Sequence, residues 1–482
     1  MKLLKKITSL YNQTNDTYKI WLSLFIIVRI FSYITFTYNL DLLNNLVSII
    51  LITLFAHLSY KKNNVAFVLV VAELILGGAG AFLSLGGFII RTWLLGIFGV
   101  TWLYHKLKQK DLSILSIKKF KWPFLIVTAV ILTAMINGFV NQHQTMFILQ
   151  DAMLYFFLFL IFPLFDYYQT IKKQLKNIVE AFIYGTSIVT FFILGLYSSG
   201  VGELPDSFYH WFRNVAGGKI TDVGGNLFRI VSSEHLFIVP IILVLFSTIL
   251  HKKKQKKAWV LLALLLAVLV LNMTRIYLLA LIISMICLAL KQSIKRWLFV
   301  STMVMLMISG WFVSFSFVTS YGASIGGSLF GLKFSGVTDP NAEVSGATRM
   351  IILPKAIEVI KTHPFVGSGL ATEITFYNPA INKEVTRTQF DWGYLEMIAE
   401  LGIIGALFYC LFFIFFGIPF LIKNYISKAT KDKVINRGLI AGAVSLFVIN
   451  LTTPALFQGY GVLYLIFVVV VSIEKDQLTI SN

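Results

Sequence analysis

The sequence predicts an all-α, polytopic membrane protein with about 14 transmembrane helices. Hydrophobic residues make up 57% of the 482 residues and charged residues only 13%, a usage outside that of soluble domains. Apolar stretches of about 20 residues, the length that crosses a bilayer, recur along the chain. Lysine and arginine concentrate in alternate segments between these stretches. The two cysteines, Cys287 and Cys410, lie inside apolar stretches, so neither a disulfide nor a metal site is expected.

The apolar stretches divide the chain into three parts. Residues 1–317 hold eleven predicted spans and an outward loop at 198–234, residues 318–392 form a large extracytoplasmic loop, and residues 393–482 hold three more spans. The predicted spans are 20–38, 42–58, 65–83, 87–104, 122–139, 146–165, 178–197, 235–250, 258–271, 276–290, 297–317, 394–422, 439–456 and 460–473. The basic start of the chain turns polar where a signal peptide would be apolar, so the first span is expected to direct insertion.

The distribution of positive charge predicts the topology. If the N-terminus is cytoplasmic, the basic segments between spans all fall on one side, and with the termini they hold about 29 of the 41 lysines and arginines. Both termini are therefore expected to be cytoplasmic. The net charge of +19 is explained by topology, and no nucleic-acid partner is expected.

The large loop at 318–392 is expected to be partly helical. The segment SGATRMIILPKAIEVIKTHPF offers Ser345 as an N-cap and continues with apolar residues at helical spacing. A segment of this kind is expected to fold against the membrane domain.

Three arginines lie on the predicted outward side: Arg229, Arg275 and Arg349. Arg275 follows a very short connection between two spans, where a charge is costly unless it meets an anion or a hydrated cavity. Arg349 lies in the first turn of the predicted loop helix, where the helix dipole opposes a cation. The alternatives are an interfacial role for Arg229 and a structural ion pair of Arg275 with Glu234 or Asp391.

Acidic residues cluster where the loop re-enters the membrane. Asp391 ends the loop, and Glu396 and Glu400 follow at a spacing that puts both on one helix face. Such a pair needs a proton or a cation, which indicates function. The alternative is a buried pair bonded to Ser, Thr or Tyr of neighbouring helices. His363, before Pro364, is expected to terminate a helix rather than act as a base.

Two segments carry a family resemblance. GATRMIILPKAIEVIKTHPFVGSGL, followed by DWGYLEMIAELGIIGALFY, resembles the signature of the O-antigen ligase and polymerase superfamily. The likeness is close over residues 345–409 and extends loosely to LFRIVSSEHLFIV and LNMTRIYLLALI. It implies a metal-independent glycosyltransferase of the C type (GT-C) without a cofactor, in the bacterial cytoplasmic membrane.

The resemblance also implies a substrate and roles. The substrate would be an undecaprenyl-diphosphate-linked oligosaccharide in the membrane lipid, its diphosphate held by Arg229, Arg275 and Arg349. A chain-length regulator would be an optional partner. Asp391 would be the base, with Glu396 as the other choice, and the accessory residues would be His363, Glu234, Glu400 and Tyr394.

The resemblance favours a polymerase of repeat units. Ligases of the superfamily carry His-Asn where this chain has Asp391-Trp392. Transfer of finished glycan to a lipid, protein or cell-wall acceptor is the first alternative. A lipid-linked oligosaccharide flippase is the second, although no internal repeat typical of transporters is visible. Arg29, Glu73, Arg91 and Asp151 would line a polar cavity in that case.

Overall fold

Helices dominate the structure. The computed structural model is about 79% helical with almost no sheet. It describes residues 17–109, 117–197, 206–224, 227–251, 255–290, 292–322, 325–327, 344–378, 382–426 and 430–480. The predicted N-terminal cytoplasmic segment before residue 17 lies outside these residues, as do parts of both predicted long loops.

Many neighbouring helices are joined by connections of only a few residues. In chain order they are α2 (Thr17–Thr37), α3 (Asp41–Lys61), α4 (Asn63–Gly77), α5 (Ile90–Gln109), α7 (Lys118–Val140), α8 (Thr145–Phe156), η1 (Phe157–Leu160), α9 (Ile161–Asp166), α10 (Tyr168–Leu196), α11 (Asp206–Asn214), η4 (His235–Phe237), α12 (Ile238–His251), α13 (Lys256–Asn272), α14 (Arg275–Ala289), α15 (Ile294–Thr319), α17 (Val344–Thr362), α18 (Gly393–Ile426), α19 (Lys431–Ile449) and α20 (Gly459–Ile480). η1 and η4 are 3₁₀ helices.

In the part of the chain that the structure describes, three antiparallel hairpins, which the sequence did not predict, interrupt the helices. They pair β1 (Ser84–Leu85) with β2 (Phe88–Ile89), β3 (Lys219–Gly224) with β4 (Leu227–Val231), and β5 (Ile374–Asn378) with β6 (Lys383–Arg387). In the second hairpin Arg229 lies opposite Thr221.

The prediction of an α-helical polytopic membrane protein is confirmed, whereas the number of spans is not. Within the described residues, seven helical runs are long and apolar enough to cross a membrane: α2, α3, α7, α8 to α9, α10, α15 and α18. Four shorter apolar runs lie at 63–77, 235–251, 275–289 and 459–473. The predicted span at 146–165 is a helix that tightens into the 3₁₀ turn η1.

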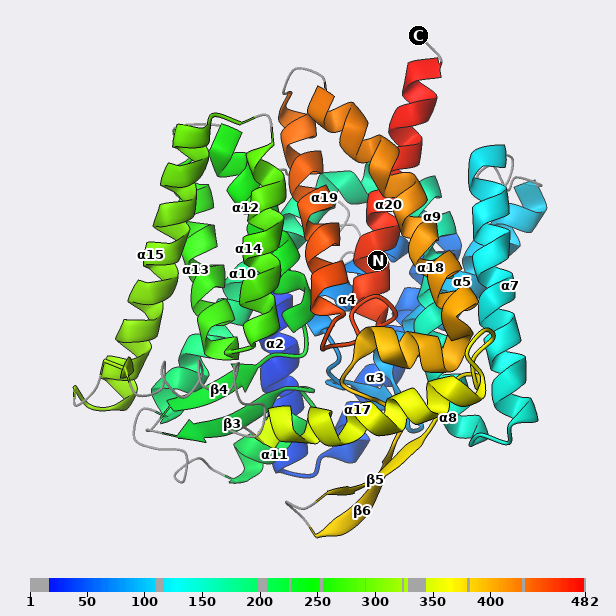
Figure 1. Cartoon of the computed structure of the whole chain (residues 1–482), viewed down its shortest axis with the longest axis horizontal. Coiled ribbons are helices and arrows are strands. Elements are labelled where there is room, and N and C mark those ends of the chain that lie inside the picture. Colours follow the sequence, from blue (N-terminus) through cyan, green and yellow to red (C-terminus); the bar gives the residue numbers. More distant parts are fainter. Residues whose placement is uncertain are drawn as a thin grey trace.

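The two predicted outward loops fold at the same end of the helix bundle. In Figure 1, α11, α17 and the hairpins β3–β4 and β5–β6 gather below the long helices. The last turns of α12, α14 and α18 and the first turns of α13, α15 and α19 lie at the opposite end. The expected helix after Ser345 is present as α17, and it begins at Val344.

Each outward loop has a small apolar core. Residues 206–231 pack Trp211, Phe212 and Phe228 against α10, α13 and α15. The second core joins α17 to β5 and to the start of α18 through Ile352, Ala356, Ile374, Phe376, Phe390 and Ala399. The loop segments are therefore parts of the folded domain.

The predicted span at 394–422 lies within α18, but this helix is broken at Gly402. This residue has φ 71° and ψ 171°, a conformation open essentially to glycine alone. Figure 1 shows the first part of α18 running across the end of the bundle beside α17, after which the helix turns and climbs through it. Glu396 and Glu400 lie on the first part.

Backbone contacts with the loop fill the break in α18. The N–H groups of Ile403 and Ser368 donate to Pro364 O and Ala399 O, at 2.9 and 2.7 Å. A side chain at Gly402 would collide with Phe365 O, and one at Gly369 (φ 100°) would collide with the backbone of α7 at Gly138. The His-Pro-x-x-Gly-x-Gly turn is thus wedged between α7 and the broken helix.

Replacing Gly402 with alanine should destabilise the protein. The strained backbone alone costs about 1–3 kcal/mol with a side chain, and the collision with the turn adds to it. The measurement is thermal unfolding of the purified protein in detergent. Gly417→Ala is the matched control, because it lies in the same helix and a methyl group there meets nothing within 4 Å. Equal melting temperatures for the two variants would contradict the role given to the break.

Candidate active site

Two of the three arginines meet at the turn between α13 and α14. Arg229, on β4, donates from Nε to Asn272 O at 2.8 Å and from Nη2 to Thr274 Oγ1 at 2.9 Å. Asn272 is the last residue of α13 and Thr274 is the N-cap of α14, so Arg275 is the next residue. The turn closes through Met273 in the left-handed conformation, with φ 50°. The hairpin β3–β4 therefore holds Arg229 beside the start of α14.

Arg349 is held against the end of the large loop. Trp392 Nε1 donates to Arg349 O at 3.2 Å, and Arg349 Nη2 lies 3.5 Å from Thr452 O. The buried Nε of Arg349 has no hydrogen-bond partner among the residues that the structure describes. Asp391, directly before Trp392, is half-buried and has φ 57°. Arg349 and Asp391 thus belong to one neighbourhood.

The packing of α14 on α19 brings the two neighbourhoods to the same end of the bundle. The helices are antiparallel and pack side by side (Figure 1), so the start of α14 and the end of α19 lie together. Arg275 begins α14, and Thr452 follows α19 by three residues. The three arginines, here called the cationic region, therefore lie at the same end of the bundle, where the loops cover the helix ends: Arg229, Arg275 and Arg349.

The carboxyl groups of Glu396 and Glu400 have different hydrogen-bond partners. Glu396 is buried, and its Oε2 accepts a hydrogen bond from Phe390 N at 2.9 Å, which fixes the loop just before Asp391. Glu400 is 2% exposed and hydrogen bonds to Asp151 and to the hydroxyl of Tyr155, at 3.3 Å for the hydroxyl. A hydrogen bond between two carboxyl groups needs a proton on one of them. The contact with Tyr155 agrees with the alternative given above for Glu400, a buried residue that is hydrogen-bonded to a tyrosine of a neighbouring helix.

Asp151 and Tyr155 are site neighbours that the sequence did not single out for this place. Both lie on α8, more than 240 positions before Glu400. In the sequence Asp151 is only one of several charges within the early predicted spans. A carboxyl group inside an apolar helix signals a polar partner, but its position does not name that partner.

The three remaining accessory residues have other contacts. Glu234 is buried and forms an ion pair with Arg29. Tyr394 donates to Phe447 O at 2.8 Å. His363 is exposed at the end of α17, as expected for a helix terminus, with Nδ1 at 3.1 Å from Thr362 Oγ1. These contacts are structural.

Buried ion pairs tie the early helices to this end of the protein. Arg29 also donates to Leu76 O at 3.0 Å. Arg91 binds Glu73 through two hydrogen bonds of 2.8 and 2.9 Å and donates to the hydroxyl of Tyr460 at 2.8 Å. Arg91 is therefore paired with Glu73 of a neighbouring early helix, and Arg29 is paired with Glu234, which lies directly before η4.

The fold and the arrangement of these residues define a polytopic membrane protein with three arginines at its loop-bearing end. Residues 259–410 match the family model described as O-antigen ligase. This part of the chain includes Arg275, Arg349 and Asp391, and its match confirms the predicted resemblance to the O-antigen ligase and polymerase superfamily. Arg229 lies before the matched part. No curated protein matches the chain.

Removing one member of the Arg29–Glu234 pair should be strongly destabilising. Arg29→Met leaves a buried carboxylate without its cation, at a cost of about 3–5 kcal/mol, and adding Glu234→Gln should recover part of the loss. The measurement is denaturant unfolding of the single and double variants. Lys355→Met, which breaks an exposed pair with Glu358, is the control with an expected loss below about 1 kcal/mol. A double variant no more stable than Arg29→Met would argue against coupling.

Proposed function

We propose that the protein is a polymerase of lipid-linked oligosaccharide repeat units. A hydroxyl oxygen of one repeat unit attacks the anomeric carbon of a glycan on undecaprenyl diphosphate. The new glycosidic bond forms as the carbon–oxygen bond to the diphosphate breaks, and the diphosphate leaves with the electron pair. The hydroxyl proton passes to a carboxylate of the protein. The reaction takes place at the outer face of the bacterial cytoplasmic membrane.

The observation that carries this proposal is the gathering of Arg229 and Arg275 at one helix turn, with Arg349 and Asp391 at the adjoining helix end. A leaving diphosphate gains negative charge, and planar guanidinium groups stabilise phosphate oxygens through paired hydrogen bonds. These cations supply the charge stabilisation for which other glycosyltransferases use a divalent metal. The matched family domain supports the same class of reaction.

Asp391 is the proposed base. It is half-buried at the end of the loop and next to the Trp392 contact with Arg349, so its carboxylate is near the proposed leaving group. Glu396 is engaged with Phe390 N. We assign Glu396 to positioning, since its hydrogen bond holds the loop residue that precedes Asp391.

The proposal includes an orientation and an architecture. The loop-bearing end faces outward, both termini are cytoplasmic, and about fourteen spans form a GT-C-like membrane domain. The basic connections at the other end support this orientation. The choice of polymerase over ligase rests on Asp391-Trp392, where ligases carry His-Asn.

Arg275→Ala and Arg349→Ala should each lower polymer formation by about 10²–10³-fold, the loss typical of removing one group that stabilises transition-state charge. The assay follows the product ladder made from purified lipid-linked repeat units by protein in lipid vesicles. Arg213→Ala is the control, because Arg213 is an exposed arginine of α11 at the same end. Normal ladders from both variants would refute the diphosphate assignment. Transfer only to a separate acceptor would indicate a ligase, and transport without a covalent product a flippase.

Asp391→Asn should reduce turnover by about 10²–10⁴-fold without weakening the binding of undecaprenyl diphosphate, because only proton removal is lost. Single-turnover rates and competition binding separate the two effects. Glu396→Gln is the comparison, and the smaller loss is expected there. A near-normal rate for Asp391→Asn together with an inactive Glu396→Gln would transfer the role of base to Glu396.

A further inference from the structure

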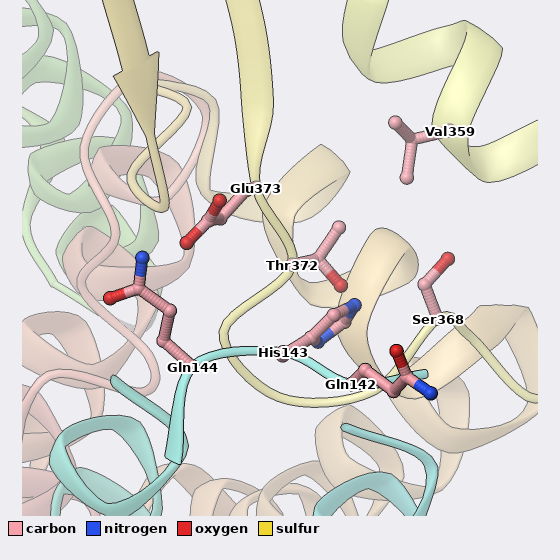
Figure 2. A pocket seen from close by; sticks show the side chains of 7 residues that line it. All are labelled: Gln142, His143, Gln144, Val359, Ser368, Thr372 and Glu373. Atoms are coloured by element: carbon pink, nitrogen blue, oxygen red, sulfur yellow. The ribbon is translucent and has the colours of Figure 1, made fainter. Parts of the chain in front are cut away.

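A polar cavity of about 260 Å³ lies at the far end of α17 from Arg349. Its walls come from the α7–α8 turn, the segment after the Gly-x-Gly turn, and α17 (Figure 2). Val359 contributes apolar surface, and the other lining residues are polar: Gln142, His143, Gln144, Ser368, Thr372 and Glu373. The volume is below the roughly 300–1,000 Å³ of pockets that enclose a whole small ligand, so the cavity suits one part of a larger molecule.

Hydrogen bonds between distant segments hold the cavity walls in place. Asn141 Nδ2 donates to Ser368 O at 2.8 Å, and Leu370 N donates to Ala134 O at 3.0 Å. Gln142 adopts the left-handed conformation, φ 58°, which turns the chain sharply at the end of α7. A site whose walls are fixed before binding loses less entropy when a ligand binds.

His143 presents an acceptor to the cavity. Its Nδ1 lies 2.7 Å from Leu370 O, and a carbonyl oxygen only accepts, so the hydrogen is on Nδ1. In the neutral ring Nε2 is then an acceptor for a ligand hydroxyl. Figure 2 shows the ring in the middle of the cavity, below the hydroxyl of Thr372.

The other polar groups favour a neutral ligand with many hydroxyls. Figure 2 shows Gln144 and Glu373 on the same side of His143, with their polar ends turned toward each other. The lining residues include a carboxylate but no arginine or lysine, which disfavours an anion. They include no Phe, Tyr or Trp, and Val359 has the one purely hydrocarbon side chain among them, which disfavours a lipid chain. Sugar hydroxyls both donate and accept, and the amide, carboxylate and imidazole groups match them.

The cavity is too far from the cationic region to hold the reacting carbon. Val359 follows Arg349 by ten residues on α17, about 15 Å along a helix axis. One sugar ring does not cover that separation, whereas a short oligosaccharide does.

We propose that this cavity is a recognition subsite for a neutral sugar residue of the glycan, several bonds away from the diphosphate. The inference rests on the proposed function and names a part of its substrate-binding surface. His143, Gln144 and Glu373 hydrogen bond to the sugar hydroxyls. They determine which glycan is bound and take no part in the chemical step.

The test measures binding of free neutral di- to tetrasaccharides of glucose, galactose and N-acetylglucosamine to the full chain in detergent by saturation-transfer NMR. The double variant Gln144→Ala/Glu373→Ala should weaken binding of the best saccharide by at least about tenfold, the loss expected for two hydrogen bonds. Both side chains reach the surface, so the variant should fold. Glu384→Ala, on the exposed strand β6, is the control and should bind normally.

Two further readouts separate this inference from the proposed function. Arg275→Ala should still bind the saccharide, since the cationic region is not part of the cavity. In the ladder assay the double variant should raise KM for lipid-linked repeat units and leave kcat within about twofold. Unchanged saccharide binding by the double variant, or absence of binding to the unaltered protein, overturns the subsite. Loss of binding in the double variant with normal ladders from the arginine variants keeps the subsite and refutes the diphosphate assignment.

Discussion

The close approach of two backbones at Gly402 is the constraint on which the loop-bearing end of the protein depends. The break in α18 lets the turn after α17 insert its carbonyl groups, and the N–H of Ile403 bonds to that turn. The same turn presses Gly369 against α7. Three segments distant in sequence are therefore joined through main-chain atoms. The first part of α18 then lies across the bundle end, and Asp391 precedes its first residue by two positions.

Charge is distributed unequally between the membrane helices and the loop-bearing end. Arg29 and Arg91 are each matched by a glutamate, as expected where an unpaired charge is costly. Arg229 and Arg349 contact carbonyl and hydroxyl oxygens at or just after the ends of α13 and α19. These contacts fix the direction of each guanidinium group at the loop-bearing end. Under the proposed function, an anionic leaving group complements these cations.

The sequence predicted the class of fold and the neighbourhood of Arg275, but not how the loops cover it. Hydropathy is decisive for membrane helices because the bilayer imposes their length and composition. The turn at Arg275 followed from two apolar stretches separated by a few residues. The sequence predicts a helix interior at Gly402, since the apolar pattern continues through Leu-Gly-Ile-Ile-Gly. A periodic apolar pattern carries no information about the φ angle of a single residue. The contacts of Arg229 and the meeting of Glu400 with Asp151 are long-range, and one sequence carries no signal for them.

The length of α17 has a consequence for selectivity between glycans. A helix is almost incompressible along its axis, so the separation between Arg349 and Val359 is set by the number of residues between them. Under the proposed function, α17 lies along the bound glycan and fixes the distance between the diphosphate and the sugar in the cavity. The sugars between the two ends of α17 would be selected by their combined length. Only the sugar that reaches the cavity would be recognised through its hydroxyl groups. A repeat unit of the wrong length would then fail even if every one of its sugars were acceptable.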